Sequence, residues 1–517
     1  MKRNNALVAC ILFSTLLSCQ KRETVLQAPE PVNPKEVIPK SAINAFIKDQ
    51  LFKTNQFDWK SANDNMVWSA LLQGDSILTV GYQPAGFADL DKKIDQIDVN
   101  SNDWRSVRNQ VMNLVLENER GQKNAIAKDA VVFPENKLPY FTVKVSHLAT
   151  VKALRASRLV RYAEPAGYGA FMDERSNTKF AVTASAPSTK SDLLSFGCGS
   201  NNPKTDLIAG TDYTAITPGA KQSWNHPYHH ITEAWTKSTG QNVKVMIIDT
   251  GVSPDQANLG SLFNQGASSG RTIQKLVTYP GATPADVCGH GTSMAGAMAA
   301  PRGTSGSAAG IAYNCNLAVV NAAENVVLLS SESQQGVANA YLQGGDDAAV
   351  KIISMSLGTP FSVSSIRDAV RYANNKKKLI FCAAGTSFSI FAGWVGVIFP
   401  ANMPEVYAVT GVKDNLTQRC ESCHVGSEVA FTIVMEKVSN GRNPLSTAMS
   451  GDVPSTVGGS SVATASCAGI AALVWSKYPA YPRDSIVARM KRASSYASNK
   501  NPDFGWGIVN ASLAVGQ

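Results

Sequence analysis

The sequence predicts a three-layer α/β domain around a mostly parallel sheet, preceded by a small α+β unit. From residue 221 onward, apolar β-branched runs alternate with segments of helical periodicity, which is the pattern of βαβ units. Between residues 36 and 165 the order is strand, helix, strand. The 517 residues are also too many for one average domain. We therefore expect two folded units.

The small α+β unit is expected to span residues 36–165. The segment that follows, 166–220, is rich in Ser, Gly, Thr, Asn and Pro, a composition typical of a linker or processing region. Apolar spacing and runs place the elements of the small unit. Strands are expected at 76–80 and 140–145 and helices at 104–119 and 149–157, and the unit closes with the segment 159–165.

The larger unit, 221–517, carries the alternating pattern. Apolar runs of strand length are bounded there by turn residues or helical segments. Strands are expected at 243–248, 317–320, 351–356, 378–383 and 406–412, and helices at 231–237, 292–299, 332–342, 364–374 and 461–477.

Composition and charge fit a globular protein that buries a sizeable core. Hydrophobic residues make up 44% and charged residues 17%, which are ordinary values for a folded domain. The net charge of +9 is dispersed, and Lys376-Lys377-Lys378 is the only run. A nucleic-acid partner is therefore not expected, since such proteins concentrate their basic residues on one face.

The first residues have the features of an export signal. Lys2 and Arg3 precede an apolar stretch, 6–17, that is too short to span a bilayer. It ends in Leu16-Leu17-Ser18-Cys19, which resembles a bacterial lipobox. We expect a signal peptide at 1–19, lipidation at Cys19, and a flexible tether at 20–35. The protein would then be an envelope lipoprotein, in the outer membrane or at the cell surface, although cleavage nearby without lipidation remains an alternative.

Cysteine usage leaves the disulfide pairing open. Without Cys10 and Cys19, seven of the nine cysteines remain in the exported chain, so at least one thiol is unpaired. Two of them belong to Cys420-Glu421-Ser422-Cys423-His424, the pattern of covalent haem attachment. A local disulfide or free thiols are the favoured interpretation. The seven are Cys198, Cys288, Cys315, Cys382, Cys420, Cys423 and Cys467.

Three short blocks carry the residue types of nucleophilic catalysis. A buried strand delivers Asp249 at its carboxyl end, Gly289-His290-Gly291-Thr292 opens a small-residue helix, and Gly459-Ser460-Ser461 opens another. A serine hydroxyl becomes a good nucleophile when a histidine accepts its proton and a buried carboxylate orients that histidine. Starting a helix at the serine directs backbone N–H groups at the developing oxyanion.

Together these blocks resemble the subtilase family of subtilisin-like serine proteases. The triad order Asp, His, Ser is that of the family. Further blocks match in register over residues 220–517: Ile353-Ser354-Met355-Ser356-Leu357-Gly358, Phe381-Cys382-Ala383-Ala384-Gly385, Phe399-Pro400-Ala401, Val406-Tyr407-Ala408-Val409 and Gly505-Trp506-Gly507-Ile508-Val509-Asn510-Ala511.

The resemblance implies a subtilisin-like fold and a secreted serine endopeptidase that works through an acyl-enzyme. Asp249, His290 and Ser461 would form the triad, and the Ser461 N–H and Thr386 would hold the oxyanion. The unit 36–165 would be an inhibitory prodomain, so that the chain is a zymogen. We expect protein or peptide substrates and a monomer. Residues expected to frame the substrate are Ser356, Leu357, Gly358, Ala383, Ala384 and Gly385.

Departures from the family pattern define the alternatives. Thr386 stands where the family has an Asn oxyanion donor, and Ser460 and Ala465 replace the usual Thr and Pro. A catalytically weak homologue that binds peptides or partners is the competing hypothesis. No cofactor is expected to be required. A structural calcium ion remains open, because Asn258 replaces an Asp that often ligates calcium.

A second histidine-rich stretch needs a separate interpretation. His226-Pro227-Tyr228-His229-His230 offers imidazole ligands, but no Asp, Glu or Cys stands at ligand spacing. We expect a surface stretch that leads into the first helix of the larger unit, and no metal site.

Overall fold

The computed structural model describes residues 37–119, 130–133, 135–170, 197–199, 201–386 and 394–516. The expected signal peptide, the tether and Cys19 lie outside the described residues, as does the 171–196 part of the expected linker.

A seven-stranded, fully parallel sheet forms the centre of the larger unit, in the order β12-β11-β10-β9-β6-β8-β7. The expected α/β fold is confirmed, and all five expected strands are present. Two more strands, β7 and β12, were not predicted. The strands are β6 (Lys244–Asp249), β7 (Ile273–Val277), β8 (Asn316–Asn321), β9 (Val350–Met355), β10 (Leu379–Ala383), β11 (Tyr407–Lys413) and β12 (Val429–Glu436).

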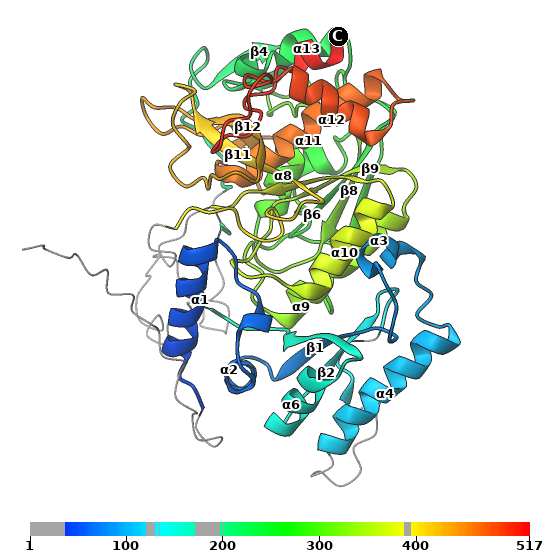
Figure 1. Ribbon diagram of the computed structural model, residues 1–517. Helices are drawn as coiled ribbons and strands as arrows, with labels where there is room; N and C mark the ends of the chain where they lie inside the picture. Colours follow the sequence, from blue (N-terminus) through cyan, green and yellow to red (C-terminus); the bar gives the residue numbers. More distant parts are fainter. Residues whose placement is uncertain are drawn as a thin grey trace, which may run out of the picture. The chain divides into compact units, whose positions relative to one another are not determined.

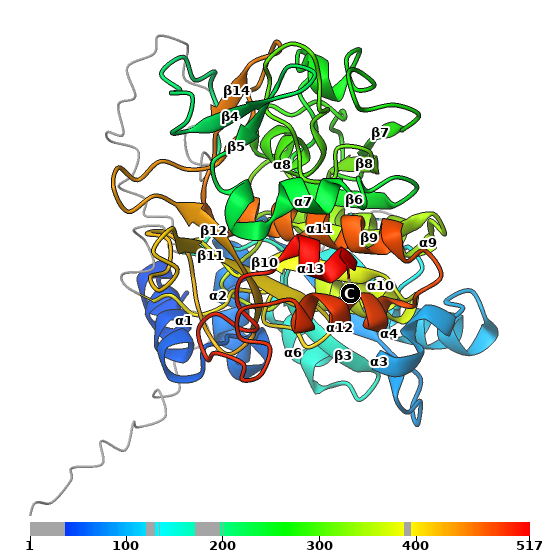
Figure 2. The same ribbon diagram turned by 90° about the horizontal axis from the view of Figure 1, so that it is seen from above.

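Helices cover both faces of this sheet, which gives the three layers (Figures 1 and 2). Successive side chains of β6 alternate between the two cores: Val245 and Ile247 face one, Met246 and Ile248 the other. The first core contains α7 (Ile231–Trp235), α8 (His290–Ala299), α11 (Gly459–Lys477), α12 (Arg483–Arg492) and α13 (Ala511–Gly516); the second contains α9 (Ser331–Asp346) and α10 (Ser364–Asn375).

The central helix α11 is long and apolar enough to cross a membrane by composition. Within the described residues, however, 89% of its most apolar window is buried inside the protein. Since a core helix of a globular protein passes the same test, α11 is a core element. It lies against α8 and the strands β9 to β12, and it positions Ser461 near its first turn.

The amino-terminal unit is an antiparallel sheet, ordered β2-β1-β3, with helices packed against it. Both expected strands and both expected helices are present, whereas α1, α2, α3 and β3 were not predicted. Its elements are α1 (Lys40–Thr54), α2 (Asp64–Leu72), β1 (Ile77–Tyr82), α3 (Leu90–Lys93), α4 (Asn102–Glu119), β2 (Tyr140–Lys144), α6 (Leu148–Ala156) and β3 (Val160–Pro165).

This unit shares one continuous hydrophobic core with α9 and α10. Phe57 packs edge-on against Phe361, which lies just before α10. Glu164 of β3 accepts hydrogen bonds from the Ser364 backbone N–H (2.6 Å) and hydroxyl (2.9 Å). A carboxylate here satisfies a free N–H at the start of α10, as a cap does.

Two short hairpins complete the described fold. β4 (Tyr213–Ile216) pairs with β5 (Ala220–Ser223), and β13 (Leu445–Thr447) with β14 (Pro454–Thr456). The boundary expected at 220/221 falls inside the first hairpin.

The cysteines form two disulfides in the described chain, Cys198–Cys288 and Cys420–Cys423. Because both sulfurs of the CxxCH sequence are bonded to each other, they are not available for haem attachment. Cys315, Cys382 and Cys467 are free and buried. Burial raises the pKa of Cys315 and of Cys382 to about 12, so these are unreactive core thiols.

The expectation of a surface stretch at 226–230 is wrong for two of its histidines. His226 and His229 are buried, 4% and 1% exposed. His229 is held by the carbonyl of Val509 at Nδ1 and the N–H of Val434 at Nε2. Burial lowers the pKa of His229 to about 4, so it is a neutral structural residue.

Candidate active site

Asp249 is the last residue of β6 and is fully buried. Its Oδ1 accepts hydrogen bonds from Nδ1 of His290 at 2.7 Å and from the Thr250 backbone N–H at 2.8 Å. A carboxylate at the carboxyl end of a central parallel strand lies where such sheets bind their ligands.

His290 is the first residue of α8 and follows Gly289, whose φ of 88° a residue with a Cβ rarely adopts. The ring is buried, and burial disfavours its charged form. The charge of Asp249 and the hydrogen bond that its carboxylate accepts from His290 outweigh burial, so the pKa of His290 lies above its ordinary value of 6.5. The bond at Nδ1 leaves Nε2 as the atom that can exchange a proton.

Asp286 supports this pair and was not identified from the sequence. Its Oδ1 accepts from Thr250 Oγ1 and the Gly289 N–H, and its Oδ2 accepts from the Thr292 N–H and hydroxyl. These four bonds tie the turn after β6 to the start of α8. The sequence feature that could have identified Asp286 is its position three residues before the Gly289-His290 block. A carboxylate there can reach the free N–H groups at the start of a helix.

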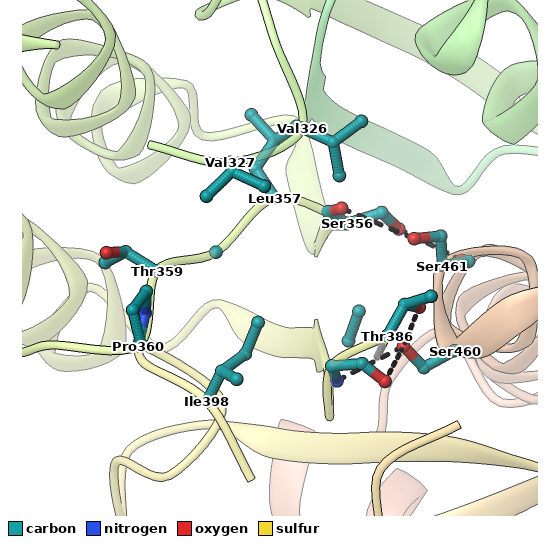
Figure 3. A pocket seen from close by; sticks show the side chains of 13 residues that line it. Val326, Val327, Ser356, Leu357, Thr359, Pro360, Thr386, Ile398, Ser460 and Ser461 are labelled. Atoms are coloured by element: carbon teal, nitrogen blue, oxygen red, sulfur yellow. Dashed lines mark hydrogen bonds between the residues drawn. The ribbon is translucent and has the colours of Figure 1, made fainter. Parts of the chain in front are cut away.

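Ser461 is the third residue of α11 and is 7% exposed. Its backbone N–H is therefore one of the first four in the helix, which have no carbonyl partner within it. Its Oγ lies 3.5 Å from the Ser356 carbonyl, and Ser356 Oγ donates to the Ser461 carbonyl at 3.0 Å (Figure 3). In the described chain no hydrogen bond joins Ser461 to His290; such bonds often form only with substrate present.

Thr386 lies beside Ser461's neighbour Ser460. The two hydroxyl oxygens are 3.3 Å apart, and Ser460 Oγ also donates to the Gly385 carbonyl at 2.8 Å (Figure 3). Gly385 adopts a φ of 125°, and a Cβ there would approach His424 Nδ1 to 2.6 Å. This turn therefore requires glycine and fixes the position of Thr386 at the end of β10.

A pocket lies between the end of β9, the end of β10 and the start of α11 (Figure 3). It brings together Ser461, Thr386 and five of the six expected substrate residues. Ala384 is the exception, since its N–H and carbonyl are bonded to Val409 and Ile398. Residues of the lining that sequence reasoning missed are Val326, Val327, Thr359, Pro360, Ile398 and Ser460.

The missed valines follow β8 in the chain, and Ile398 precedes the Phe399-Pro400-Ala401 block. Loops after parallel strands line the ligand crevice of such sheets. The position of the two valines after β8 could therefore have indicated that they line the pocket. With five apolar residues in its wall, the pocket suits an apolar side chain.

The Asn258 side chain is hydrogen-bonded to neighbouring side chains. Its amide nitrogen donates to Asp452 Oδ1 at 2.7 Å, and its Oδ1 accepts from Gln265 Nε2 at 2.7 Å. Both ends of the side chain are thus satisfied by protein. Among the described residues, no group of three or more His, Cys, Asp and Glu could hold a metal ion.

Comparison with known proteins places these residues in one family. The model of the subtilase family matches residues 240–508, which is just over half of the chain and includes Asp249, His290 and Ser461. The chain belongs to the subtilase family.

Curated relatives of this subtilase include two proteases. Subtilisin DY of Bacillus licheniformis is 33% identical over 282 residues, covering 53% of this chain and 92% of that protein. A thermostable alkaline protease of Halalkalibacterium halodurans is 32% identical over 278 residues, covering 53% and 68%. Among solved structures, MycP1 from Mycobacterium smegmatis has a TM-score of 0.48 at 18% identity, covering 63% of this chain and 89% of that one.

Proposed function

We propose that this subtilase is a serine endopeptidase with Asp249, His290 and Ser461 as its catalytic triad. The observation that carries the proposal is the 2.7 Å hydrogen bond between His290 Nδ1 and Asp249, together with a pocket that Ser461 lines. Its relatives include proteases, so peptide bonds in proteins or peptides are the proposed substrates.

In the proposed reaction, Ser461 Oγ attacks the peptide carbonyl carbon while His290 Nε2 takes the hydroxyl proton. Asp249 holds the ring and stabilises its charged form. The tetrahedral intermediate collapses as His290 gives that proton to the leaving amine, which leaves an acyl group on Ser461. Water then attacks the ester by the same proton route, and the carboxylic acid product leaves with Ser461 restored.

The oxyanion of each intermediate would lie at the amino terminus of α11. The Ser461 N–H and the Thr386 hydroxyl are the proposed donors, and backbone or side-chain donors fixed in advance are effective there. Ser461 Oγ must turn from the Ser356 carbonyl toward His290 for the first step. A serine side chain rotates between staggered positions at little cost.

The amino-terminal unit is the proposed inhibitory prodomain. Its continuous core with α9 and α10, and the Glu164 cap on α10, support a role in folding or restraining the catalytic unit. Removal is proposed by cleavage between residues 166 and 221, which would convert a zymogen to the active enzyme.

Export and lipid anchoring are also proposals. Two disulfides support an oxidising compartment outside the cytoplasm. Attachment at Cys19 would place the enzyme in the cell envelope, and Cys19→Ala is then expected to move it from the membrane to the soluble fraction.

Labelling with a serine-directed phosphonate tests the function directly. The wild-type chain should form a covalent adduct at Ser461, and Ser461→Ala should form none. The alternative, a peptide-binding homologue with weak turnover, is favoured by the Thr386 substitution. It predicts that peptides bind to the wild-type protein while labelling stays at the level of Ser461→Ala.

A further inference from the structure

A short segment ahead of the catalytic sheet crosses the turn that carries His290. Cys198 is bonded to Cys288, two residues before His290. The Gly199 N–H donates to the Cys288 carbonyl at 2.9 Å, and Asn201 Nδ2 donates to the Gly289 carbonyl at 2.7 Å. One covalent bond and two hydrogen bonds therefore hold the two residues that precede His290.

The same segment also contacts the chain that leads to Ser461. The Asn201 carbonyl accepts from the Met449 N–H at 3.1 Å, and the Asn202 carbonyl accepts from Ser455 Oγ at 2.7 Å. The Lys204 N–H donates to the Pro454 carbonyl at 3.0 Å. Met449 lies in the loop between β13 and β14, and Ser455 lies in β14. Helix α11 begins three residues after β14 ends. The segment thus joins the approach to His290 with the approach to Ser461.

The contact at Gly289 is close and buried. Asn201 is 2% exposed, and a Cβ on Gly289 would lie 2.3 Å from Asn201 Oδ1. The Gly289 carbonyl also accepts from the Ser293 N–H, the first such bond of α8. Movement of Gly289 therefore moves the start of α8, and with it the ring of His290.

We propose that residues 198–199 and 201–204, the amino-terminal clamp, position His290 for proton transfer with Ser461. The inference rests on the proposed function and adds Asn201 and the Cys198–Cys288 disulfide as positioning residues. It also places the activating cut on the amino side of Cys198, since a clamp that acts in catalysis must stay continuous with the mature chain.

A clamp that only stabilises the fold would predict something different. It would lower the melting temperature when broken and leave kcat unchanged. A positioning clamp controls the distance from His290 to Ser461, and a shift of about 1 Å in such a pair costs on the order of 100-fold in rate.

The test compares Asn201→Ala and the double variant Cys198→Ser/Cys288→Ser with the matched control Asn202→Ala. The Asn202 side chain is exposed, and among the described residues only its backbone carbonyl takes part in a hydrogen bond. We expect kcat to fall about 10- to 100-fold in the first two variants at little-changed KM. Phosphonate labelling should slow in parallel, and the acid midpoint of the kcat/KM profile should shift down as Asp249 loses its hold on His290.

Unchanged kcat and pH midpoint in both variants would overturn the clamp while leaving the proposed function intact. A wild-type enzyme that shows no hydrolysis and no labelling would instead overturn the proposed function. An active enzyme whose amino terminus lies after Asn201 would also contradict the clamp.

If the variants do not accumulate as folded protein, a second measurement on the wild-type enzyme tests the clamp. The folded wild-type enzyme can be treated briefly with reductant and alkylated, and mass spectrometry identifies molecules modified at Cys198 and Cys288. Loss of kcat in step with this modification, with circular dichroism unchanged, supports the clamp. Full kcat in molecules alkylated at Cys198 overturns it.

Discussion

Arg161 of β3 and Asp368 of α10 form a paired ion bridge between the amino-terminal unit and the larger unit. Both guanidinium Nη atoms lie 2.8 Å from the two carboxylate oxygens, and the Tyr162 hydroxyl donates to Asp368 at 3.0 Å. The side chains are only 13% and 2% exposed. The bidentate geometry fixes the angle of β3 against α10 as well as its distance.

Breaking this bridge from one side is expected to be costly. Arg161→Ala leaves the Asp368 carboxylate buried beside Tyr162 without its cation, and such losses amount to about 3–5 kcal/mol. The free energy of unfolding, measured in the Ser461→Ala background to prevent self-cleavage, checks this value. Lys53→Ala is the control, because the Lys53–Asp49 pair is about half exposed and contributes less than about 1 kcal/mol. Equal effects of the two substitutions would contradict the account.

Glu164 is expected to make the folding stability of the protein depend on pH. Burial, reinforced by the charge of Asp58, raises its pKa to about 7 despite Arg367 and the bonds from Ser364. The folded chain therefore holds a proton that the unfolded chain releases near 4.5, so stability falls as pH rises from about 4.5 to 7. Glu164→Gln should flatten this part of the unfolding curve. An unchanged slope in the variant would contradict the assignment to Glu164.

Proton transfer predicts a second pH dependence, in activity. His290 must be neutral to accept the Ser461 proton, and its pKa is raised above 6.5 by Asp249. We expect kcat/KM to rise with pH through a midpoint above 6.5. Asp249→Asn should move this midpoint down and lower kcat by about 10⁴-fold. If the midpoint does not move in Asp249→Asn, the group that titrates in the activity profile is not His290.

Thr386 is expected to contribute a donor to the oxyanion. Thr386→Val keeps the shape but removes the hydroxyl, and loss of one such donor costs up to roughly 10²–10³ in kcat. Thr386→Ser, which keeps the hydroxyl, is the matched control. If Thr386→Val hydrolyses peptide at the parental rate and Thr386→Asn raises kcat, the hydroxyl has no such role, and the triad assignment is unaffected.

Much of the fold followed from local pattern. The apolar run that ends at Asp249 was sufficient to predict β6, and the apolar length of 461–477 was sufficient to predict α11. Both elements are buried in the core, and an almost wholly apolar sequence is the mark of such an element. β7 was missed because it is a five-residue edge strand, partly exposed, with Gln274 and Lys275 in its middle. Its pairing with β8, rather than its own composition, makes it a strand.

The site was predictable only where its residues stand in short blocks. Asp249 ends β6, His290 begins α8 and Ser461 lies in the first turn of α11, so their sequence neighbours identified them. Asp286 and Asn201 act through contacts with residues distant in the chain, Thr250 and Gly289. No spacing rule links residues 201 and 289. The burial of His229 likewise depends on Val434 and Val509, far away in sequence.

The central claim is that Ser461 is the nucleophile of a working endopeptidase. Hydrolysis of casein by purified wild-type and Ser461→Ala protein, at equal concentration after confirmation of the fold by circular dichroism, tests it most directly. Because a serine and its histidine act as a unit, we expect the variant to lose on the order of 10⁶ in kcat. Casein hydrolysis that persists at the wild-type rate in Ser461→Ala would contradict the account.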